Sequence, residues 1–398
     1  MDRTVAGPLE GLRVIEMGQL IAGPFCGQLL GDMGADVVKI EPPGVGDPVR
    51  AWGQPGFPLH WEVIGRNKRC VSADLRHPLG QDLARKLIAT ADVLVENFRP
   101  GTLEKWNLAP ESLRRDDPRL IVVRMSGYGQ KGPYAGRAGY GGIGEAMGGW
   151  RYIVGDADRP PSRMGVSIGD ALAATYGAMG ALAALRWREQ TGEGQIIDSA
   201  LYEAVLQVME SLVPDYAVAG FTRERSGPIL PGIAPSNVYR CADGEFLIAA
   251  NQDTVFARFC AAIGAPELAT DPRFATHQER GARQAELDAL IEVWTASRTV
   301  AEVEAAMIGA GVPAGKVFRA AEMLSDPHFN ARESIVEVEH PRWGRLPMQN
   351  VFPRLSATPG RVRRTACQSV GGDNAEVYGE LLGLDVNDLA RLQSEGVI

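Results

Sequence analysis

The chain has 398 residues, of which 45% are hydrophobic and 23% are charged, an ordinary composition for a globular protein. Its formal net charge of −8 argues against a general nucleic-acid binder, whereas local basic clusters can still bind small anions. The length predicts roughly two domains.

Cysteine usage and the composition of the first residues indicate the compartment. The five cysteines are odd in number and show neither a CxxC pair nor zinc-site spacing, so we expect a reducing compartment, no disulfide framework and no metal site. The first residues lack an apolar signal core, and the most apolar helical stretch, 171–185, is shorter than the roughly 20 residues that span a bilayer. We expect a cytoplasmic protein with no membrane partner.

The first third of the chain alternates runs typical of strands with runs typical of helices. Between Pro78 and Thr90, for example, Leu79, Leu83, Leu87 and Ile88 share one helical face. Strands that alternate with helices form a parallel sheet covered by helices. We therefore expect a Rossmann-like α/β domain, with helices at 23–34 and 78–90 and strands at 12–17, 36–41, 70–74, 92–96 and 120–125.

Composition changes further along the chain. After residue 170 a helix runs to about Thr191, and a second long helix ends near Ala219. The proline- and glycine-rich stretch 226–235 marks a boundary, and a hairpin turning at Asp243-Gly244 follows, with helices at 252–263, 283–297 and 299–310. We expect a large α/β domain over 1–225, completed by 326–398, and a small α+β domain over 226–325.

Two segments match the dinucleotide-binding pattern GxGxxG, at Gly127–Gly132 and Gly139–Gly144. A dinucleotide site also needs a helix that opens at once after strand and glycines. Pro133 and more glycines follow the first segment, so we interpret both as loops that let a ligand approach the backbone. The five histidines show no triad or metal-ligand pattern, and His77 and His340, each before a proline, are interpreted as loop residues.

Basic and polar side chains gather near predicted strand ends, at Arg66–Arg69, Arg76, Asn97–Arg99 and Lys105. Two interpretations stay open. One is a solvated surface. The other is a phosphate site at the carboxyl edge of the sheet, where arginines and backbone N–H groups hold the anion.

Asp170 follows Gly169 and opens a helix of small residues. Aspartate is a favoured N-cap residue, because its oxygen accepts a hydrogen bond from an N–H of the first turn. A carboxylate at a helix start can equally face a substrate and act as a nucleophile. The residue by itself does not separate these two roles.

Several segments together resemble the class III CoA-transferase family, the group of formyl-CoA, carnitine and bile-acid CoA-transferases. They occur in family order over nearly the whole chain, and their combination is more specific than any single one. The segments are Pro8–Glu16, Ala22–Pro24, Gly34–Glu41, Asn67–Arg69, Ala91–Gly101, Gly127–Gly129, Gly169-Asp170, Thr191–Gln195 and Ala310–Pro313.

The resemblance implies a fold and roles for individual residues. The family's nucleophilic aspartate falls on Asp170, and the family fold is a two-domain α/β chain that forms an interlocked homodimer. The sequence departs from family members at Ile21 and Pro42, and Pro231–Pro235 stands near the place of an active-site glycine run. The segments that contact CoA fall on Ile21, Ala22, Ala73, Asp74, Leu75, Arg76, Asn97, Phe98, Arg99, Lys105, Ala138, Gly139 and Tyr140.

The implied chemistry suits a lone aspartate. Its carboxylate is ionised at neutral pH, so it can attack an acyl-CoA thioester without a general base and form a mixed anhydride. CoA thiolate then attacks the aspartyl carbonyl to give an aspartyl-CoA thioester, and the acceptor acid runs the steps in reverse. A dry site protects these intermediates, and backbone N–H groups at 139–144 offer oxyanion donors. CoA is thus a substrate, and no permanently bound cofactor is expected.

The segments Tyr140–Tyr152 and Arg159–Arg163 resemble the branch that uses succinyl-CoA and C4–C5 dicarboxylates such as malate, citramalate, mesaconate, itaconate or glutarate. A dicarboxylate keeps one free carboxylate, which an arginine binds bidentately. The candidates for substrate contacts are Gly141, Glu145, Arg151 and Arg163. The alternative is that both arginines are structural.

Two other functions stay open. An α-methylacyl-CoA racemase of the same fold uses a histidine aligned with Tyr140, yet no histidine lies between His77 and His277. A non-catalytic CoA-binding subunit would keep the CoA site and leave Asp170 as a cap.

Overall fold

The computed structural model describes residues 7–398, which divide into two compact units. The first contains the described residues up to Trp150, together with 164–213 and 333–398, and the second contains 151–163 and 214–332. The second unit therefore includes 151–163, 214–225 and 326–332, which the boundaries drawn from the sequence left in the large domain.

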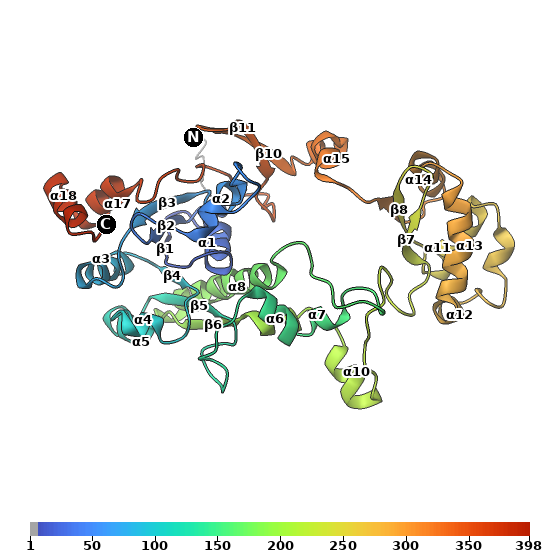
Figure 1. The fold of residues 1–398 in the computed structure, drawn as a ribbon, viewed down its shortest axis with the longest axis horizontal. Coiled ribbons are helices and arrows are strands. Elements are labelled where there is room, and N and C mark those ends of the chain that lie inside the picture. Colours follow the sequence, from blue (N-terminus) through green and yellow to red (C-terminus); the bar gives the residue numbers. More distant parts are fainter. Residues whose placement is uncertain (1–6) are drawn as a thin grey trace. The chain divides into compact units, whose positions relative to one another are not determined.

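A six-stranded parallel sheet is the centre of the first unit (Figure 1). The strands lie in the order β3-β2-β1-β4-β5-β6, and their buried side chains explain the apolar runs in the sequence. This sheet confirms the expected α/β class. The strands are β1 (Arg13–Glu16), β2 (Asp36–Glu41), β3 (Lys68–Ser72), β4 (Val93–Glu96), β5 (Ile121–Ser126) and β6 (Ile196–Ala200).

Helices cover both faces of this sheet (Figure 1). Val14, Val93 and Val123 face α1 (Ala22–Asp32) and α8 (Ile168–Thr191). Ile15 and Leu94 face the other layer, which contains α3 (Pro78–Ile88), α4 (Thr102–Lys105), α5 (Pro110–Asp116), α17 (Asn374–Leu382) and α18 (Val386–Ser394). Within α3, the predicted core residue Leu79 is exposed instead.

Helix α8 packs closely on the sheet because its inner face is made of small residues. A Cβ atom on Gly177 would lie 3.1 Å from Val123 Cγ1. With 24 residues, 18 consecutive ones of which have a mean hydropathy of 1.3, α8 is the one helix within residues 7–398 that matches a membrane span in length and composition. The expectation that this apolar segment is too short is therefore wrong. The match is weak evidence for a membrane, since α8 also supplies Ala174, Ala178 and Ala181 to the core.

The second unit contains the predicted hairpin. β7 (Ser236–Arg240) and β8 (Glu245–Ala249) pair antiparallel across Asp243-Gly244, and β9 (Ala314–Lys316) joins β8. The helices of this unit include α11 (Asp253–Ala262), α12 (His277–Ala282), α13 (Gln284–Ala296), α14 (Val300–Gly309), α15 (Ala320–Ser325) and α16 (Pro327–Ala331).

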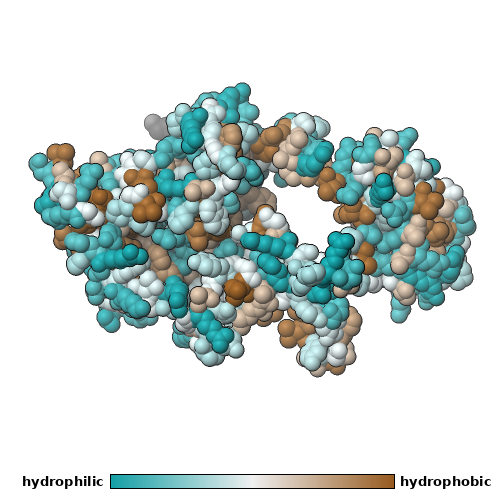
Figure 2. All heavy atoms as spheres, in the orientation of Figure 1, coloured by the Kyte–Doolittle hydropathy of each residue, from teal (hydrophilic) through white to brown (hydrophobic). Residues whose placement is uncertain are grey.

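The long helix predicted to end near Ala219 is two helices, α9 (Leu201–Leu206) and α10 (Leu212–Ala219). Val213, Tyr216 and Val218 on α10 are exposed, and Figure 2 shows apolar surface over this helix. The remaining elements are α2 (Leu59–Ile64), α6 (Gly141–Met147), α7 (Trp150–Ile153), the 3₁₀ helices at Pro48–Ala51 and Pro266–Ala269, and the antiparallel pair β10 (Ile335–His340) and β11 (Gly344–Gln349).

Candidate active site

A cavity of about 240 Å³ lies where the strand order of the sheet reverses. β1 has β2 on one side and β4 on the other, so the chain leaves β1 and β4 in opposite directions and a crevice opens between their loops. Open α/β sheets bind ligands at this position. The lining residues are Gln19, Leu20, Ala22, Asn97, Phe98, Arg99, Pro100, Met125, Ser126, Gly127, Arg137, Ala138, Gly139, Tyr140, Asp170 and Leu201.

The Asn97 side chain joins the two loops that form this crevice. Its Oδ1 accepts a hydrogen bond from Gln19 N at 2.8 Å, and its Nδ2 donates to Gln19 O at 2.8 Å. The loop at Gly18 also lies very close to the start of α1, since a Cβ atom on Gly18 would lie 2.8 Å from Gly23 Cα. The loop after β1 is therefore held in one conformation from the side of β4.

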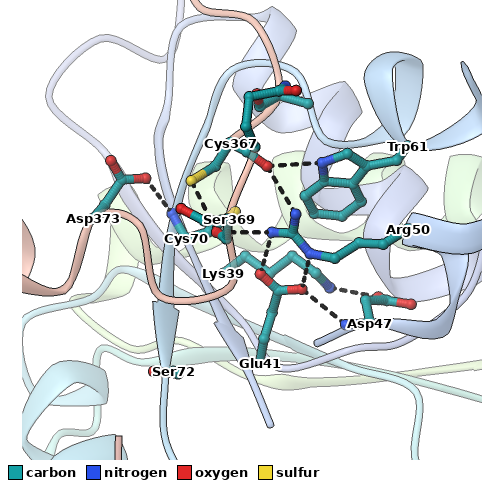
Figure 3. A network of polar contacts seen from close by, with 12 residues as sticks. Lys39, Glu41, Asp47, Arg50, Trp61, Cys70, Ser72, Cys367, Ser369 and Asp373 are labelled. Carbon is teal, nitrogen blue, oxygen red and sulfur yellow. Dashed lines mark hydrogen bonds and ion pairs between the residues drawn. The ribbon is translucent and has the colours of Figure 1, made fainter. Parts of the chain in front are cut away.

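A buried ion network supports the same loop from the side of β2, and Figure 3 shows its Lys39–Asp47 pair. Lys39 Nζ lies 2.8 Å from both Glu16 Oε1 and Asp47 Oδ2, and it donates to Gly18 O at 2.7 Å. Asp47 Oδ1 in turn accepts from Leu20 N at 3.0 Å. Burial by itself lowers the pKa of Lys39, but Glu16 and Asp47 raise that pKa above its ordinary value, so the ammonium stays charged.

Asp170 is the third residue of α8 and lines the cavity, half-buried. The N-cap position belongs to Ser167, so the interpretation of Asp170 as the cap is wrong. A Cβ atom on Gly141 would lie only 1.9 Å from Asp170 Oδ2. Glycine at 141 is thus what lets the carboxylate lie against the first residue of α6, where the positive end of a helix favours an anion.

The structure brings many of the predicted site residues to one place. Arg99 donates to Gly136 O across the cavity rim. Glu145 is buried on α6, where its Cγ would lie 3.4 Å from a Cβ atom on Gly169. The predicted residues that line the cavity with Asp170 are Ala22, Asn97, Phe98, Arg99, Ala138, Gly139 and Tyr140.

Other predicted residues lie outside this cavity. Ile21 lines a separate cavity of about 430 Å³ beside α2. Ala73 to Arg76 follow β3 at the edge of the sheet, and Lys105 is exposed at the end of α4. Arg151 and Arg163 belong to the second unit. The roles of these residues stay predictions.

The basic segment Arg66–Arg69 differs from both interpretations made from the sequence. It lies at the start of β3 rather than at its carboxyl end, and its side chains are largely buried in ion pairs. Arg66 Nη2 lies 2.6 Å from Asp32 Oδ2, and Lys68 Nζ lies 2.6 Å from Glu16 Oε2. This segment therefore stabilises the fold and does not form a phosphate site.

Sequence reasoning missed part of the cavity wall. Gln19 and Leu20 directly precede the predicted Ile21, and Arg137 directly precedes Ala138. Extending each predicted CoA-binding segment by one or two residues toward the N-terminus would have included them. The Arg137 guanidinium stacks 3.6 Å from the centre of the Tyr134 ring.

Neither glycine motif has the geometry of a dinucleotide site. The first follows β5 but leads into turns, and the second opens α6 after a loop rather than a strand. His340 corrects another expectation, because it ends β10 and is buried, with Nε2 2.8 Å from Glu62 Oε2. Across residues 7–398 we find no cluster of three histidine, cysteine or acidic side chains that could hold a metal ion.

Fold and cavity together define an α/β enzyme with a small-molecule site at the switch point of its sheet. The sequence profile of CoA-transferase family III matches residues 9–374, and the chain belongs to that family. The protein is thus a class III CoA-transferase.

Its relatives identify the branch. The chain is 55% identical over 395 residues to the succinyl-CoA–D-citramalate CoA-transferase of Chloroflexus aurantiacus, covering 98% of both chains. It is 41% identical over 406 residues to the beta subunit of the succinyl-CoA–L-malate CoA-transferase of that organism, covering 100% of both. A crystal structure of a CAIB/BAIF family protein from Brucella suis is similar with a TM-score of 0.84 and 36% identity, over 94% of this chain and 99% of that one. These relatives confirm the resemblance to the succinyl-CoA:dicarboxylate branch.

Proposed function

We propose that this protein moves CoA from succinyl-CoA to a C4–C5 dicarboxylic acid, with Asp170 as the nucleophile. The observation that carries the proposal is the Asp170 carboxylate, which lines the cavity at the switch point and lies against Gly141. Citramalate is the first acceptor to test, because the relative at 55% identity carries that name. Malate, mesaconate, itaconate and glutarate are the further candidates.

The reaction divides into four acyl exchanges, which take place at the succinyl carbonyl, twice at Asp170 Cγ, and finally at the acceptor carbonyl. A carboxylate oxygen of Asp170 attacks the thioester carbonyl of succinyl-CoA, and CoA thiolate leaves a mixed anhydride. The thiolate attacks Asp170 Cγ, which releases succinate and leaves an aspartyl-CoA thioester. The acceptor carboxylate attacks this thioester and displaces CoA, which then attacks the acceptor carbonyl. The products are acceptor-CoA and the original Asp170 carboxylate.

The surroundings of Asp170 support this chemistry in two ways. The apolar side chains of Phe98, Met125 and Leu201 line the cavity beside polar backbone, and they limit the water that would hydrolyse an anhydride. The start of α6 offers its first N–H groups beside the carboxylate, where negative charge develops on the attacked carbonyl.

The ligand contacts extend this proposal. We assign CoA binding to the loops at 21–22, 73–76, 97–99 and 138–140 and to Lys105, and dicarboxylate binding to Gly141, Glu145, Arg151 and Arg163. Arg99 and Arg137 add positive charge at the cavity rim, which suits an anionic thioester.

We also propose an interlocked homodimer in the cytoplasm. The exposed apolar side chains of α10 support a partner surface, since contiguous exposed apolar patches mark interaction sites. Light scattering on the purified protein tests the dimer, and a monomer at micromolar concentration would contradict it.

An acceptor screen tests the substrate class. Purified protein is incubated with succinyl-CoA and one acid at a time, and the acyl-CoA products are separated by liquid chromatography. We expect kcat/KM at least tenfold higher for C4–C5 dicarboxylates than for formate, acetate or propionate, because one lost buried ion pair costs more than about 1.4 kcal/mol. Equal values for monocarboxylates would refute the dicarboxylate assignment.

The nucleophile has its own test. Asp170→Asn is expected to lower kcat by about 10³-fold or more, because the amide cannot form the anhydride. Hydroxylamine added during turnover of the native enzyme should leave a hydroxamate at residue 170, seen by peptide mass spectrometry. Asp82→Asn, a surface change in α3, is the matched control and should keep full activity. Near-native transfer by Asp170→Asn would exclude the mechanism.

The same assays separate the two alternatives. A racemase would exchange the α-proton of a 2-methylacyl-CoA for deuterium from solvent, and none of the residues that line the cavity is a histidine able to do so. A non-catalytic subunit would bind CoA and transfer nothing when purified alone.

A further inference from the structure

Two cysteines that are far apart in the sequence meet where the C-terminal segment returns to the sheet (Figure 3). Cys70 lies in β3 and is fully buried, whereas Cys367 lies in the segment before α17 and is half-buried. Cys367 packs against the apolar cluster that contains Cys70, and its thiol donates a hydrogen bond to Ser369 O at 3.3 Å. Both belong to the first unit, so their contact does not depend on how the second unit is placed.

The backbone on each side of this thiol pair is fixed by named contacts (Figure 3). Arg50 Nη1 and Trp61 Nε1 both donate to Cys367 O, at 2.8 and 2.9 Å. Cys70 N donates to Asp373 Oδ2 at 2.7 Å, which ties β3 to the residue before α17. These bonds fix the segment that carries Cys367 beside the strand that carries Cys70.

The electrostatics give the two thiols different chemical characters. Interaction with the Cys70 thiol lowers the pKa of Cys367 to about 7, against burial and Asp373, which raise it. The same interaction, with burial, raises the pKa of Cys70 well above its ordinary value. Arg50 is the nearby cation that interacts with both sulfurs. With a pKa of about 7, Cys367 is partly ionised at neutral pH, whereas Cys70 stays a protonated thiol.

The other three cysteines lack this character. Burial raises the pKa of Cys26 and of Cys260 to about 12, and it also raises the pKa of Cys241. An oxidant that reacts with thiolates will therefore select Cys367.

We propose that Cys367 and Cys70 form a reversible oxidation site, in which a hydroperoxide converts the thiol pair to a disulfide that joins the C-terminal segment to β3. The Cys367 thiolate attacks the outer oxygen of the peroxide, the O–O bond breaks, and the alkoxide or hydroxide leaves and takes a proton from water. The resulting sulfenic acid is attacked by Cys70 sulfur, the S–O bond breaks, and the departing hydroxide takes the Cys70 proton as water. Two thiols lose two electrons, and the peroxide gains them.

The bond would tighten the wall behind the active-site cavity. Cys70 packs in one apolar cluster with Ala366, Trp61 and Ile21, and Ile21 directly follows the loop that lines the cavity. A disulfide here also closes a very long loop of chain, which restricts the unfolded state. Oxidation is therefore expected to stabilise the first unit. This proposal does not depend on which acid accepts CoA.

The test is oxidation of the full-length enzyme with a small molar excess of hydrogen peroxide, followed by blocking of free thiols and peptide mass spectrometry. We expect a peptide pair joined through residues 70 and 367, two hydrogens lighter than the reduced pair and restored by dithiothreitol. The thermal midpoint of the oxidised first unit should rise by about 3 to 8 °C.

Three variants make the test decisive. Cys367→Ser removes the reactive thiol at a half-buried position, and it should show neither the cross-link nor the thermal shift. Cys70→Ser should halt at the sulfenic acid on Cys367, which dimedone traps. Cys241→Ala, in the second unit, should behave as the native enzyme. Over-oxidation of Cys367 without the cross-link, a bond to another cysteine, or an unchanged midpoint after cross-linking would overturn the proposal.

Discussion

Gly141→Ala is the most direct test of how the fold holds Asp170. The new methyl group would begin 1.9 Å from Asp170 Oδ2, far inside any tolerated contact, so the carboxylate has to move by at least about 1 Å. A misplacement of this size costs about 10²-fold in rate, since the reacting atoms lose their near-attack geometry. We therefore expect kcat to fall about 100-fold, which corresponds to about 2.7 kcal/mol in the activation barrier.

The same substitution should leave the fold intact. Gly141 is the first residue of α6 and does not have a positive φ, so alanine is compatible with the backbone there. Alanine also favours a helix over glycine by up to about 1 kcal/mol, which offsets part of the steric cost. The predicted signature is thus a large loss of kcat with little change in the thermal unfolding midpoint.

The assay is transfer from succinyl-CoA to citramalate, followed by chromatography of the acyl-CoA products, with circular dichroism on the same samples. Gly165→Ala is the matched control, because a Cβ atom at that exposed position meets nothing within 4 Å. Its kcat should equal the native value. If Gly141→Ala kept kcat within about threefold of the control, the contact between residues 141 and 170 would not position the nucleophile.

Three further changes test other parts of the first unit. Arg66→Met leaves the buried Asp32 carboxylate without its cation and should lower the free energy of unfolding by about 3 to 5 kcal/mol in urea titrations; a smaller loss would mean that water enters the site. Asn97→Ala removes both hydrogen bonds to Gln19 and should raise KM for succinyl-CoA about tenfold, whereas an unchanged KM would show that the loop is rigid without them. Alkylation of Cys367 by iodoacetamide should be half-maximal near pH 7 and rise with pH as the thiolate forms, while half-maximal labelling near pH 9 would show that the thiol pair has no electrostatic effect.

The sequence predicted five of the six strands of the sheet because their signals are local, and β6 was not among them. Each buried strand is a short apolar run, and α1, α3 and α8 begin and end near residues that favour the start or the end of a helix. Likewise the hairpin at Asp243-Gly244 has the turn residues that such a hairpin requires. Local patterns of this kind predict the folded structure reliably because they depend only on backbone geometry and on the periodicity of the side chains.

Long-range pairings explain the errors. The charges of Arg66–Arg69 suggested a ligand site, because nothing in the sequence shows that Asp32, Glu16 and Asp36 pair with them. His340 was expected in a loop for the same reason, since its partner Glu62 lies far away in the chain. A buried ion pair leaves no local pattern, so only the folded chain distinguishes it from a binding site.

The candidate site depends both on sequence motifs and on long-range contacts that only the folded chain shows. The family resemblance located Asp170, but the reason that this carboxylate can lie in the cavity is the missing side chain of Gly141, and this depends on two helices that meet in space. The opposite wall depends on Lys39, whose three partners come from β1, the loop after it and the segment after β2. Because that cluster is fully buried, loss of one member leaves uncompensated charges beneath the loop at Gln19 and Leu20. The position of the nucleophile is therefore set by backbone contact, and the position of the ligand loop by buried charge, so changes to the two should affect kcat and KM separately.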